Sequence, residues 1–196
     1  MSFIDTVPED QATGDVAATY ETDRELFGHL PNFTRGFSWR PDVYNAWRAL
    51  NGSVKAGMDL RRYELATVSA ARRLRSTYCS LAHGSVLLDN FQSAEGVRAL
   101  VEGHDAAELD AVDLAVVALA DKVAADATSV TQADIDRLRS LGLSDADVLD
   151  VVLAAAVRCF FSKVLDGLGI EADAKYSALD AELRGLLTVG RPIAAS

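Results

Sequence analysis

Cysteine is almost absent from this chain of 196 residues, which contains only Cys79 and Cys159. Two cysteines are too few for a disulfide scaffold or for a structural zinc site built on thiolates. Proline and glycine are also scarce, with four and 13 residues respectively, while 49% of the chain is hydrophobic. This composition excludes a fibrous or disordered chain and favours a compact, mostly helical globule.

Positive charge is in short supply. The chain has 19 Lys and Arg against 29 Asp and Glu, which gives a formal net charge of −10. Nucleic-acid binding requires clustered basic residues that neutralise phosphates, and anchoring on anionic lipid requires them too. We therefore expect neither a nucleic-acid partner nor a membrane partner.

Long hydrophobic runs are missing as well. The longest one, from Val151 to Val157, is far shorter than the roughly 20 residues of a membrane-spanning helix. The first five residues do not combine basic residues with a following apolar run, so we expect no signal peptide. A cytoplasmic, reducing location is the expectation that follows.

Apolar residues recur at helical spacing over most of the chain, and no segment alternates as a strand would. Pro41 is placed to start a helix, and Asp59 is placed to cap the next one. The nearly all-apolar helix from Ala146 to Leu168 is typical of a central helix that is buried on most sides. The expected helices span residues 16–27, 33–37, 41–54, 60–75, 77–88, 95–101, 106–125, 131–142, 146–168 and 173–187.

The chain shows no linker and no long low-complexity stretch. This pattern predicts one all-α domain. We expect residues 1–14 to form an N-terminal arm, residues 15–190 a single helical domain, and residues 191–196 a C-terminal tail.

The chemistry-bearing residues gather around Cys79 and His83, which share a helix face because they are four residues apart. If Ser76 or Thr77 caps this helix, Cys79 lies in its first turn, where free N–H groups and the helix dipole favour a negative sulfur. An imidazole nearby can accept the thiol proton. The competing interpretation is a small buried cysteine beside a structural histidine.

A carboxylate candidate, Glu64, lies on the preceding helix. Measured from Ser76, it is roughly 18 Å back along its helix, whereas His83 is roughly 10 Å and Cys79 roughly 4–5 Å forward along the next. In a helix hairpin, Glu64 therefore meets His83 more readily than Cys79. The expected order is carboxylate, imidazole, thiol, as in other activated nucleophiles. Alternatively, Glu64 is a surface residue paired with a nearby arginine.

Other polar residues give weaker signals. Ser76 and Tyr78, both close to Cys79 in the sequence, are candidates for lining a substrate pocket. His29 and His104 fall in expected turns, where we predict them to be solvated, and neither has metal-ligand spacing to His83. No glycine-rich phosphate loop is present. We expect no metal and no cofactor.

The spacing of these residues resembles the signature of the AhpD-like, carboxymuconolactone decarboxylase superfamily. That signature is a Glu, eleven residues, Cys-x-x-Cys, three residues and a His. Here Glu64 is followed after eleven residues by Ser76-Thr77-Tyr78-Cys79 and, after three more, by His83.

The resemblance extends beyond the motif. Residues 27–32, 138–145 and 166–170 are similar to stretches of the longer members described as uncharacterised peroxidase-related proteins, so the similarity covers most of residues 15–172. It implies an all-α, AhpD-like helical bundle. It also implies a homo-oligomer, which we expect to be a dimer, trimer or hexamer.

In the peroxidase branch of this superfamily, the second cysteine attacks an alkyl hydroperoxide and the first cysteine resolves the sulfenic acid. By this resemblance Cys79 is the attacking residue, and Glu64 and His83 form the proton relay. Ser76 occupies the place of the resolving cysteine and cannot form the disulfide. The resemblance thus implies an antioxidant, peroxiredoxin-like activity that uses an external thiol or Cys159, unless the activity has been lost.

Two alternatives remain open. One is a carboxymuconolactone-decarboxylase-like lyase or isomerase acting on a small organic acid or lactone, in which His83 and Glu64 carry out acid–base chemistry without the thiol. The other is a catalytically inactive oligomeric binding protein, because a fold does not determine a function. A closed pocket with a buried Cys79 would favour the second alternative.

Overall fold

A computed structural model describes residues 2–91, 93–102 and 109–195. These residues contain ten α-helices and no strand, apart from one isolated bridge between Ala172 and Ile193. The predicted all-α class is therefore confirmed. The α-helices are α1 (Gly14–Phe27), α2 (Asn32–Gly36), α3 (Pro41–Gly57), α4 (Leu60–Arg73), α5 (Thr77–Asn90), α6 (Ala94–Glu102), α7 (Ala111–Asp126), α8 (Gln132–Ser140), α9 (Asp145–Gly167) and α10 (Ala181–Leu187), with 3-10 turns η1 (Glu9–Gln11), η2 (Ala127–Ser129) and η3 (Ala174–Ala178).

Local signals explain where several helices begin and end. Helix α1 ends at Gly28, whose φ of 74° lies in the left-handed region that glycine adopts without strain. Pro41 opens α3 at a position where its missing N–H costs nothing. Asp59 caps α4 by accepting a hydrogen bond from the backbone N–H of Arg62, as predicted.

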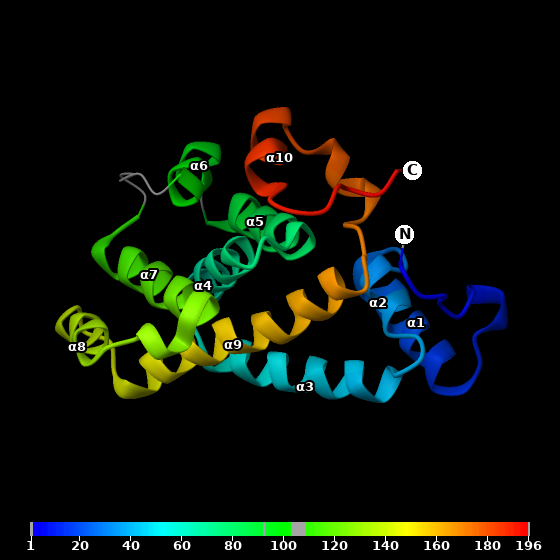
Figure 1. Ribbon diagram of the computed structural model, residues 1–196, viewed down its shortest axis with the longest axis horizontal. Coiled ribbons are helices and arrows are strands. Elements are labelled where there is room, and N and C mark those ends of the chain that lie inside the picture. The colour runs from blue at the N-terminus through cyan, green and yellow to red at the C-terminus, as the bar shows by residue number, and fades with distance from the viewer. Residues whose placement is uncertain (1, 92, 103–108, 196) are drawn as a thin grey trace.

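Helix α4 lies at the centre of the bundle and packs against α5, α7 and α9 (Figure 1). Helix α3 runs antiparallel to α9 along the lower edge of this view, and the indole N–H of Trp47 donates to the carbonyl of Val157 at 3.4 Å. Helix α10 closes the other side by packing on α5 and α6. The bundle thus surrounds the α4–α5 hairpin on most sides.

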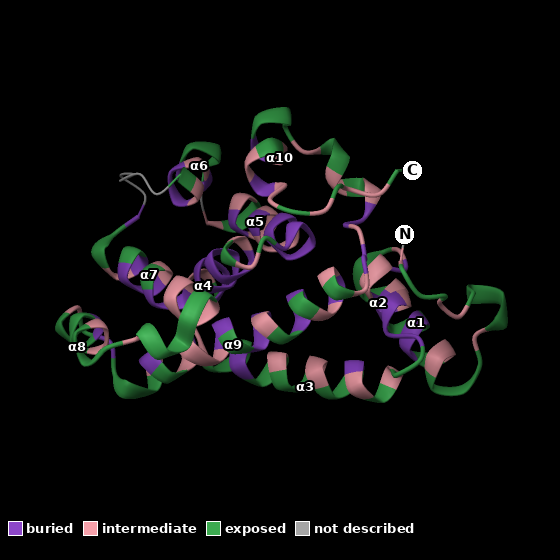
Figure 2. Cartoon of the chain, in the orientation of Figure 1, coloured by how far each residue is buried: buried purple, intermediate pink, exposed green. Residues whose placement is uncertain are grey.

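The most enclosed helix is α4 rather than α9. Every residue from Tyr63 to Ala71 is buried, whereas α9 keeps an outer face on which Leu149 and Phe160 are 55% and 44% exposed (Figure 2). Most residues of 146–168 are buried or partly buried, as predicted, but this helix is not the central one and one face of it is exposed. Apolar composition alone did not reveal that small alanines let α4 pack closely on three neighbours.

Two predicted helices have different limits. The segment expected as one helix over 173–187 divides into η3 and α10, because Asp180 accepts hydrogen bonds from two backbone N–H groups and starts a new helix. Helix α7 begins at Ala111 because Asp110 forms a capping box with Asp113. Residues 106–108, where we expected α7 to start, lie outside the described residues.

Both ends of the described chain contact the bundle, and they lie near each other (Figure 1). The backbone N–H of Phe3 donates to Leu168 at 2.8 Å, and that of Ala194 donates to Ala172 at 2.9 Å. No helix in the described ranges is long and apolar enough to cross a membrane.

Candidate active site

The candidate site is built on the tight turn between α4 and α5. Arg75 adopts a left-handed φ of 58°, and the N–H of Ser76 donates back to the carbonyl of Ala71 at 2.9 Å. This turn directs α5 back along α4 and places Cys79 in the first turn of α5, as predicted. Ser76 occupies the N-cap position, but its side chain makes no capping hydrogen bond.

Glu64 and His83 meet across this hairpin. The Nδ1 atom of His83 lies 2.6 Å from Oε2 of Glu64. The Nζ atom of Lys55, from α3, lies 3.6 Å from the other carboxylate oxygen. Glu64 is 1% exposed, so the alternative of a surface carboxylate is wrong, and the contact agrees with the helix-length estimate. Its catalytic role stays a prediction.

The protonation states of the pair follow from its surroundings. Burial acts to raise the pKa of Glu64, but His83, Lys55 and Arg158 outweigh it and hold that pKa below its ordinary value. Burial and the charge of Arg158 lower the pKa of His83, despite the opposing effect of Glu64. Glu64 is therefore ionised and His83 neutral at neutral pH. Since Nδ1–H donates to Glu64, Nε2 is left as a hydrogen-bond acceptor.

These shifts predict how folding stability depends on pH. The pKa of His83 is lowered from 6.5 in the folded protein, so the folded state binds fewer protons than the unfolded state below that pH. Its contribution to stability is complete above about pH 6.5 and is lost as the pH falls toward the lowered pKa. We expect the thermal midpoint to fall on acidification from neutral pH, and to fall less in His83→Gln. Parallel curves for the two proteins would contradict this assignment.

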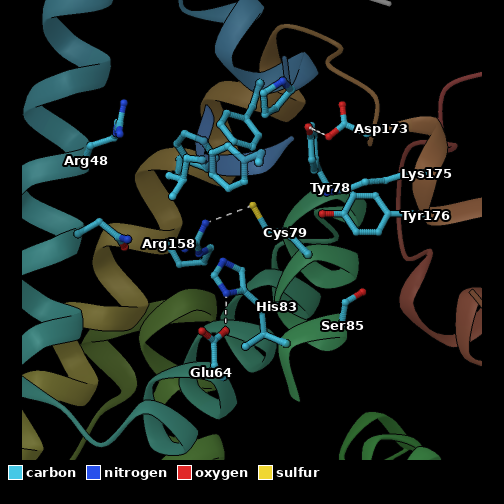
Figure 3. A pocket seen from close by; sticks show the side chains of 18 of the residues that line it. Arg48, Glu64, Tyr78, Cys79, His83, Ser85, Arg158, Asp173, Lys175 and Tyr176 are labelled. Carbon is cyan, nitrogen blue, oxygen red and sulfur yellow. Dashed lines mark hydrogen bonds and ion pairs between the residues drawn. The ribbon is translucent and has the colours of Figure 1, made fainter. Parts of the chain in front are cut away.

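The sulfur of Cys79 makes its hydrogen bond with Arg158, a residue of α9. The Nη1 atom of Arg158 lies 3.5 Å from Sγ (Figure 3). Within the described residues, no hydrogen bond joins Sγ to His83, although both side chains line the same pocket. The predicted step from His83 to Cys79 is thus not a direct contact here.

Sequence reasoning missed Arg158 and the residues that hold it. Its Nη2 atom donates to the hydroxyl of Tyr63 at 3.5 Å, and that hydroxyl donates to Asn51 at 2.7 Å. These contacts join α9, α4 and α3. The available signal was a single arginine within the apolar stretch of the predicted helix 146–168, followed directly by Cys159.

Cys79 lines a pocket of about 810 Å³, although its own side chain is buried. The pocket wall is rich in aromatic rings, with Trp47 and Phe161 stacked at 3.9 Å between centroids. The lining also includes Leu26, which is 64% exposed, so the pocket reaches the surface. The aromatic lining residues are Phe27, Phe33, Tyr44, Trp47, Tyr78, Phe161 and Tyr176.

A second carboxylate, Asp173, lies at another part of the same pocket (Figure 3). The hydroxyl of Tyr78 donates to Asp173 at 2.5 Å, so Tyr78 lines the pocket as expected. His29 also contacts this carboxylate, at 3.2 Å. The His29 side chain is 34% exposed, so it is partly solvated as predicted, and it is also held by a carboxylate from the segment after α9. His104 lies outside the described residues.

Two other predicted participants are not among the pocket-lining residues. Ser76 is fully buried, and Cys159 lies on α9 next to Arg158 but does not line the pocket. Burial raises the pKa of the Cys159 thiol, which lowers its reactivity at neutral pH. No set of three His, Cys, Asp or Glu side chains is arranged to hold a metal ion in the part of the chain that the structure describes.

Comparisons with known proteins identify the fold. No family model and no curated protein matches the sequence. Among solved structures, an uncharacterised peroxidase-related protein from Ralstonia eutropha JMP134, described as an alkylhydroperoxidase AhpD core, aligns with a TM-score of 0.79 and 20% identity over 89% of this chain and 94% of its own. A peroxidase-related protein from Silicibacter sp. TM1040 aligns with a TM-score of 0.73 and 21% identity, over 90% and 91%.

A third structure with this fold carries a different activity in its description. It is a cysteine-to-alanine variant of the debrominase Bmp8 in complex with 2,3,4-tribromopyrrole, with a TM-score of 0.75 and 14% identity over 91% of this chain and 96% of its own. The chain thus has the AhpD-like helical fold, and its similarity is to the peroxidase-related proteins that the sequence motif indicated. At these identities, the likeness concerns the fold alone.

Proposed function

We propose that this protein is a cofactor-free, one-cysteine thiol peroxidase that reduces organic hydroperoxides. The observation that carries the proposal is the convergence of Cys79, His83, Glu64 and Arg158 at one pocket. These residues supply a nucleophile, a base, a carboxylate that orients the base, and a cation beside the sulfur. The AhpD-like, peroxidase-related neighbours support the general class of activity.

The chemistry balances with the residues present. The Cys79 thiolate attacks the distal oxygen of the hydroperoxide, so that an S–O bond forms and the O–O bond breaks. His83 takes the proton of the distal oxygen at Nε2, directly or through a water, and returns it to the departing alkoxide. Glu64 stabilises the imidazolium that forms in between. The products are an alcohol and a Cys79 sulfenate.

Regeneration requires a thiol from outside the chain. Ser76 has no sulfur, and Cys159 is not at the pocket. An external thiol therefore displaces water from the protonated sulfenic acid and forms a mixed disulfide, and a second thiol releases Cys79. The surface-reaching pocket leaves a route for that thiol.

The pocket supports an organic substrate in preference to hydrogen peroxide. A volume of about 810 Å³ and a wall of aromatic rings fit an apolar or aromatic body that the small peroxide lacks. The proposed reaction needs two small-molecule partners, a hydroperoxide and a thiol. It requires neither a nucleic acid nor a membrane. Homo-oligomerisation and a cytoplasmic location stay predictions.

Trapping of the sulfenic acid tests this proposal. Protein treated with cumene hydroperoxide in the presence of dimedone should carry the dimedone adduct on Cys79 and not on Cys159, as read by peptide mass spectrometry. Untreated protein is the control. Absence of the adduct on Cys79 after peroxide treatment would overturn the proposal.

A second candidate function is that of a lyase or isomerase acting on a small organic acid or lactone. The observation that favours it is that the Glu64–His83 pair is in direct contact whereas His83 and the sulfur are not. Arg48 and Lys55 also line the pocket and add positive charge to it, with Arg48 paired to Asp23 at 2.9 Å and Lys55 lying 3.6 Å from Glu64. In that case His83 moves a substrate proton and Cys79 is dispensable.

A further inference from the structure

Arg158 is a charged side chain in the middle of the longest helix, and it is 2% exposed. Its guanidinium lies over the rings of Trp47 and Phe161, 5.9 and 5.7 Å from their centroids. Aromatic faces attract a cation without neutralising it. An unpaired buried charge is strongly destabilising, so Arg158 requires a negative partner.

The direct contacts of Arg158 include no carboxylate among the described residues. Nη1 contacts the sulfur of Cys79, and Nη2 contacts the hydroxyl of Tyr63. The Tyr63 hydroxyl donates its proton to Asn51 at 2.7 Å, so in this geometry it is neutral. Cys79 is therefore the contacting group that is able to carry the missing negative charge.

The charges around the sulfur lead to the same assignment. Arg158 from α9 and Lys55 from α3 are positive, while Glu64 from α4 is the only carboxylate that contacts Lys55 or His83 in the described chain. His83 is neutral at neutral pH, because burial and the charge of Arg158 lower its pKa. Lys55 is 46% exposed, so water solvates its charge, whereas Arg158 is buried. Arg158 is thus the buried cation in contact with the sulfur, and a thiolate at Cys79 gives it an anion at contact distance.

We infer that Arg158 is a catalytic residue that holds Cys79 as a thiolate and then holds the sulfenate that forms when the sulfur takes the distal oxygen of a hydroperoxide. The guanidinium contacts the reacting atom itself and needs no motion to do so. The sulfenate half of this role rests on the proposed function, whereas the thiolate half does not. This assigns to Arg158 the contact with sulfur that sequence spacing had assigned to His83.

Alkylation of Cys79 tests the inference without any peroxide. In a Cys159→Ser background, Cys79 is the sole thiol, and its reaction with iodoacetamide at neutral pH reports the thiolate. Arg158→Met, which removes the charge and keeps an unbranched side chain, should slow this reaction by about tenfold or more. Arg158→Lys keeps a charge but cannot reach Cys79 and Tyr63 together, so an intermediate rate is expected.

Lys163→Met is the matched control. It removes an exposed cation from the same helix, away from the pocket lining, and should leave the rate unchanged. An alkylation rate in a folded Arg158→Met protein equal to that of the parent would overturn the inference. If Arg158→Met does not fold, the Arg158→Lys variant provides the test. A parental alkylation rate in that variant would also overturn the inference.

Different outcomes would refute the peroxidase proposal and the role of Arg158. If the parent protein gives no dimedone adduct but Arg158→Met alkylates slowly, the peroxidase proposal fails and the role of Arg158 in holding the thiolate stands. If the adduct forms and the alkylation rates are equal, the peroxidase proposal stands and the role of Arg158 is refuted.

Discussion

Replacing Cys79 with serine is expected to abolish hydroperoxide reduction, with a loss of more than about 1,000-fold in kcat/KM. The hydroxyl of serine is not ionised beside Arg158 at neutral pH and has no accessible sulfenic state. The reaction therefore loses both its nucleophile and its oxidation product. The volume change is small and serine can still accept a hydrogen bond from Arg158, but the guanidinium loses its anionic partner, so we expect a folded protein with a lower thermal midpoint.

The measurement is consumption of cumene hydroperoxide with an excess of a small thiol as reductant. Cys159→Ser is the matched control from the same chain, because Cys159 does not line the pocket, and it should retain parental activity. A Cys159→Ser protein as inactive as Cys79→Ser would show that the second cysteine resolves the first, contrary to the external-thiol cycle.

The same variant separates the two candidate functions. If turnover of a small acid or lactone is found and survives in Cys79→Ser but not in His83→Ala, the acid–base pair works without the sulfur. That outcome would favour the lyase or isomerase. Loss of hydroperoxide reduction in both variants supports the peroxidase.

Replacing Glu64 with glutamine is the second substitution with a large expected effect. Its carboxylate fixes the Nδ1–H tautomer of His83 through the 2.6 Å contact and stabilises the imidazolium that forms while the proton is transferred. The amide carries no charge, and it can turn its NH₂ group toward Nδ1, which favours the wrong tautomer. We expect kcat/KM to fall by about 10²–10⁴-fold.

Steady-state kinetics should show this loss mainly in kcat, since Glu64 contacts His83 rather than the sulfur. Glu95→Gln makes the same chemical change at an exposed position of α6 and is expected to be neutral. Iodoacetamide alkylation of Cys79 should change much less than peroxide turnover, because Arg158 remains. A Glu64→Gln protein with parental kcat would remove the relay from the mechanism.

The helices were largely predictable because their limits depend on nearby residues. Asp59 caps α4, Pro41 begins α3, and Gly28 ends α1, each within a few residues of the signal that indicated it. The failure at residues 173–187 has the same origin. Asp180 is an acceptable residue within an amphipathic pattern, and only the direction of the chain after η3 makes it an N-cap.

The contact between Glu64 and His83 was the part of the candidate site that was predictable in the same way. Glu64 and His83 are joined by a short hairpin, so counting residues along two helices was enough to bring them together. Arg158 was not predictable by such counting. It lies 79 residues from Cys79 and 95 from Tyr63, and no local pattern indicates which helix packs across the sulfur.

By itself, the sequence determined an all-α chain, the α4–α5 hairpin and the placement of Cys79 in the first turn of a helix. These features depend on capping, periodicity and loop length, which act over a few residues. Only the tertiary structure decided that α9 crosses α4 and α5 with a buried guanidinium beside the sulfur, and that His29 turns to Asp173. Such contacts arise from packing between segments that are distant in the sequence. This packing buries charged groups, and a buried charge is stable only beside a suitable partner.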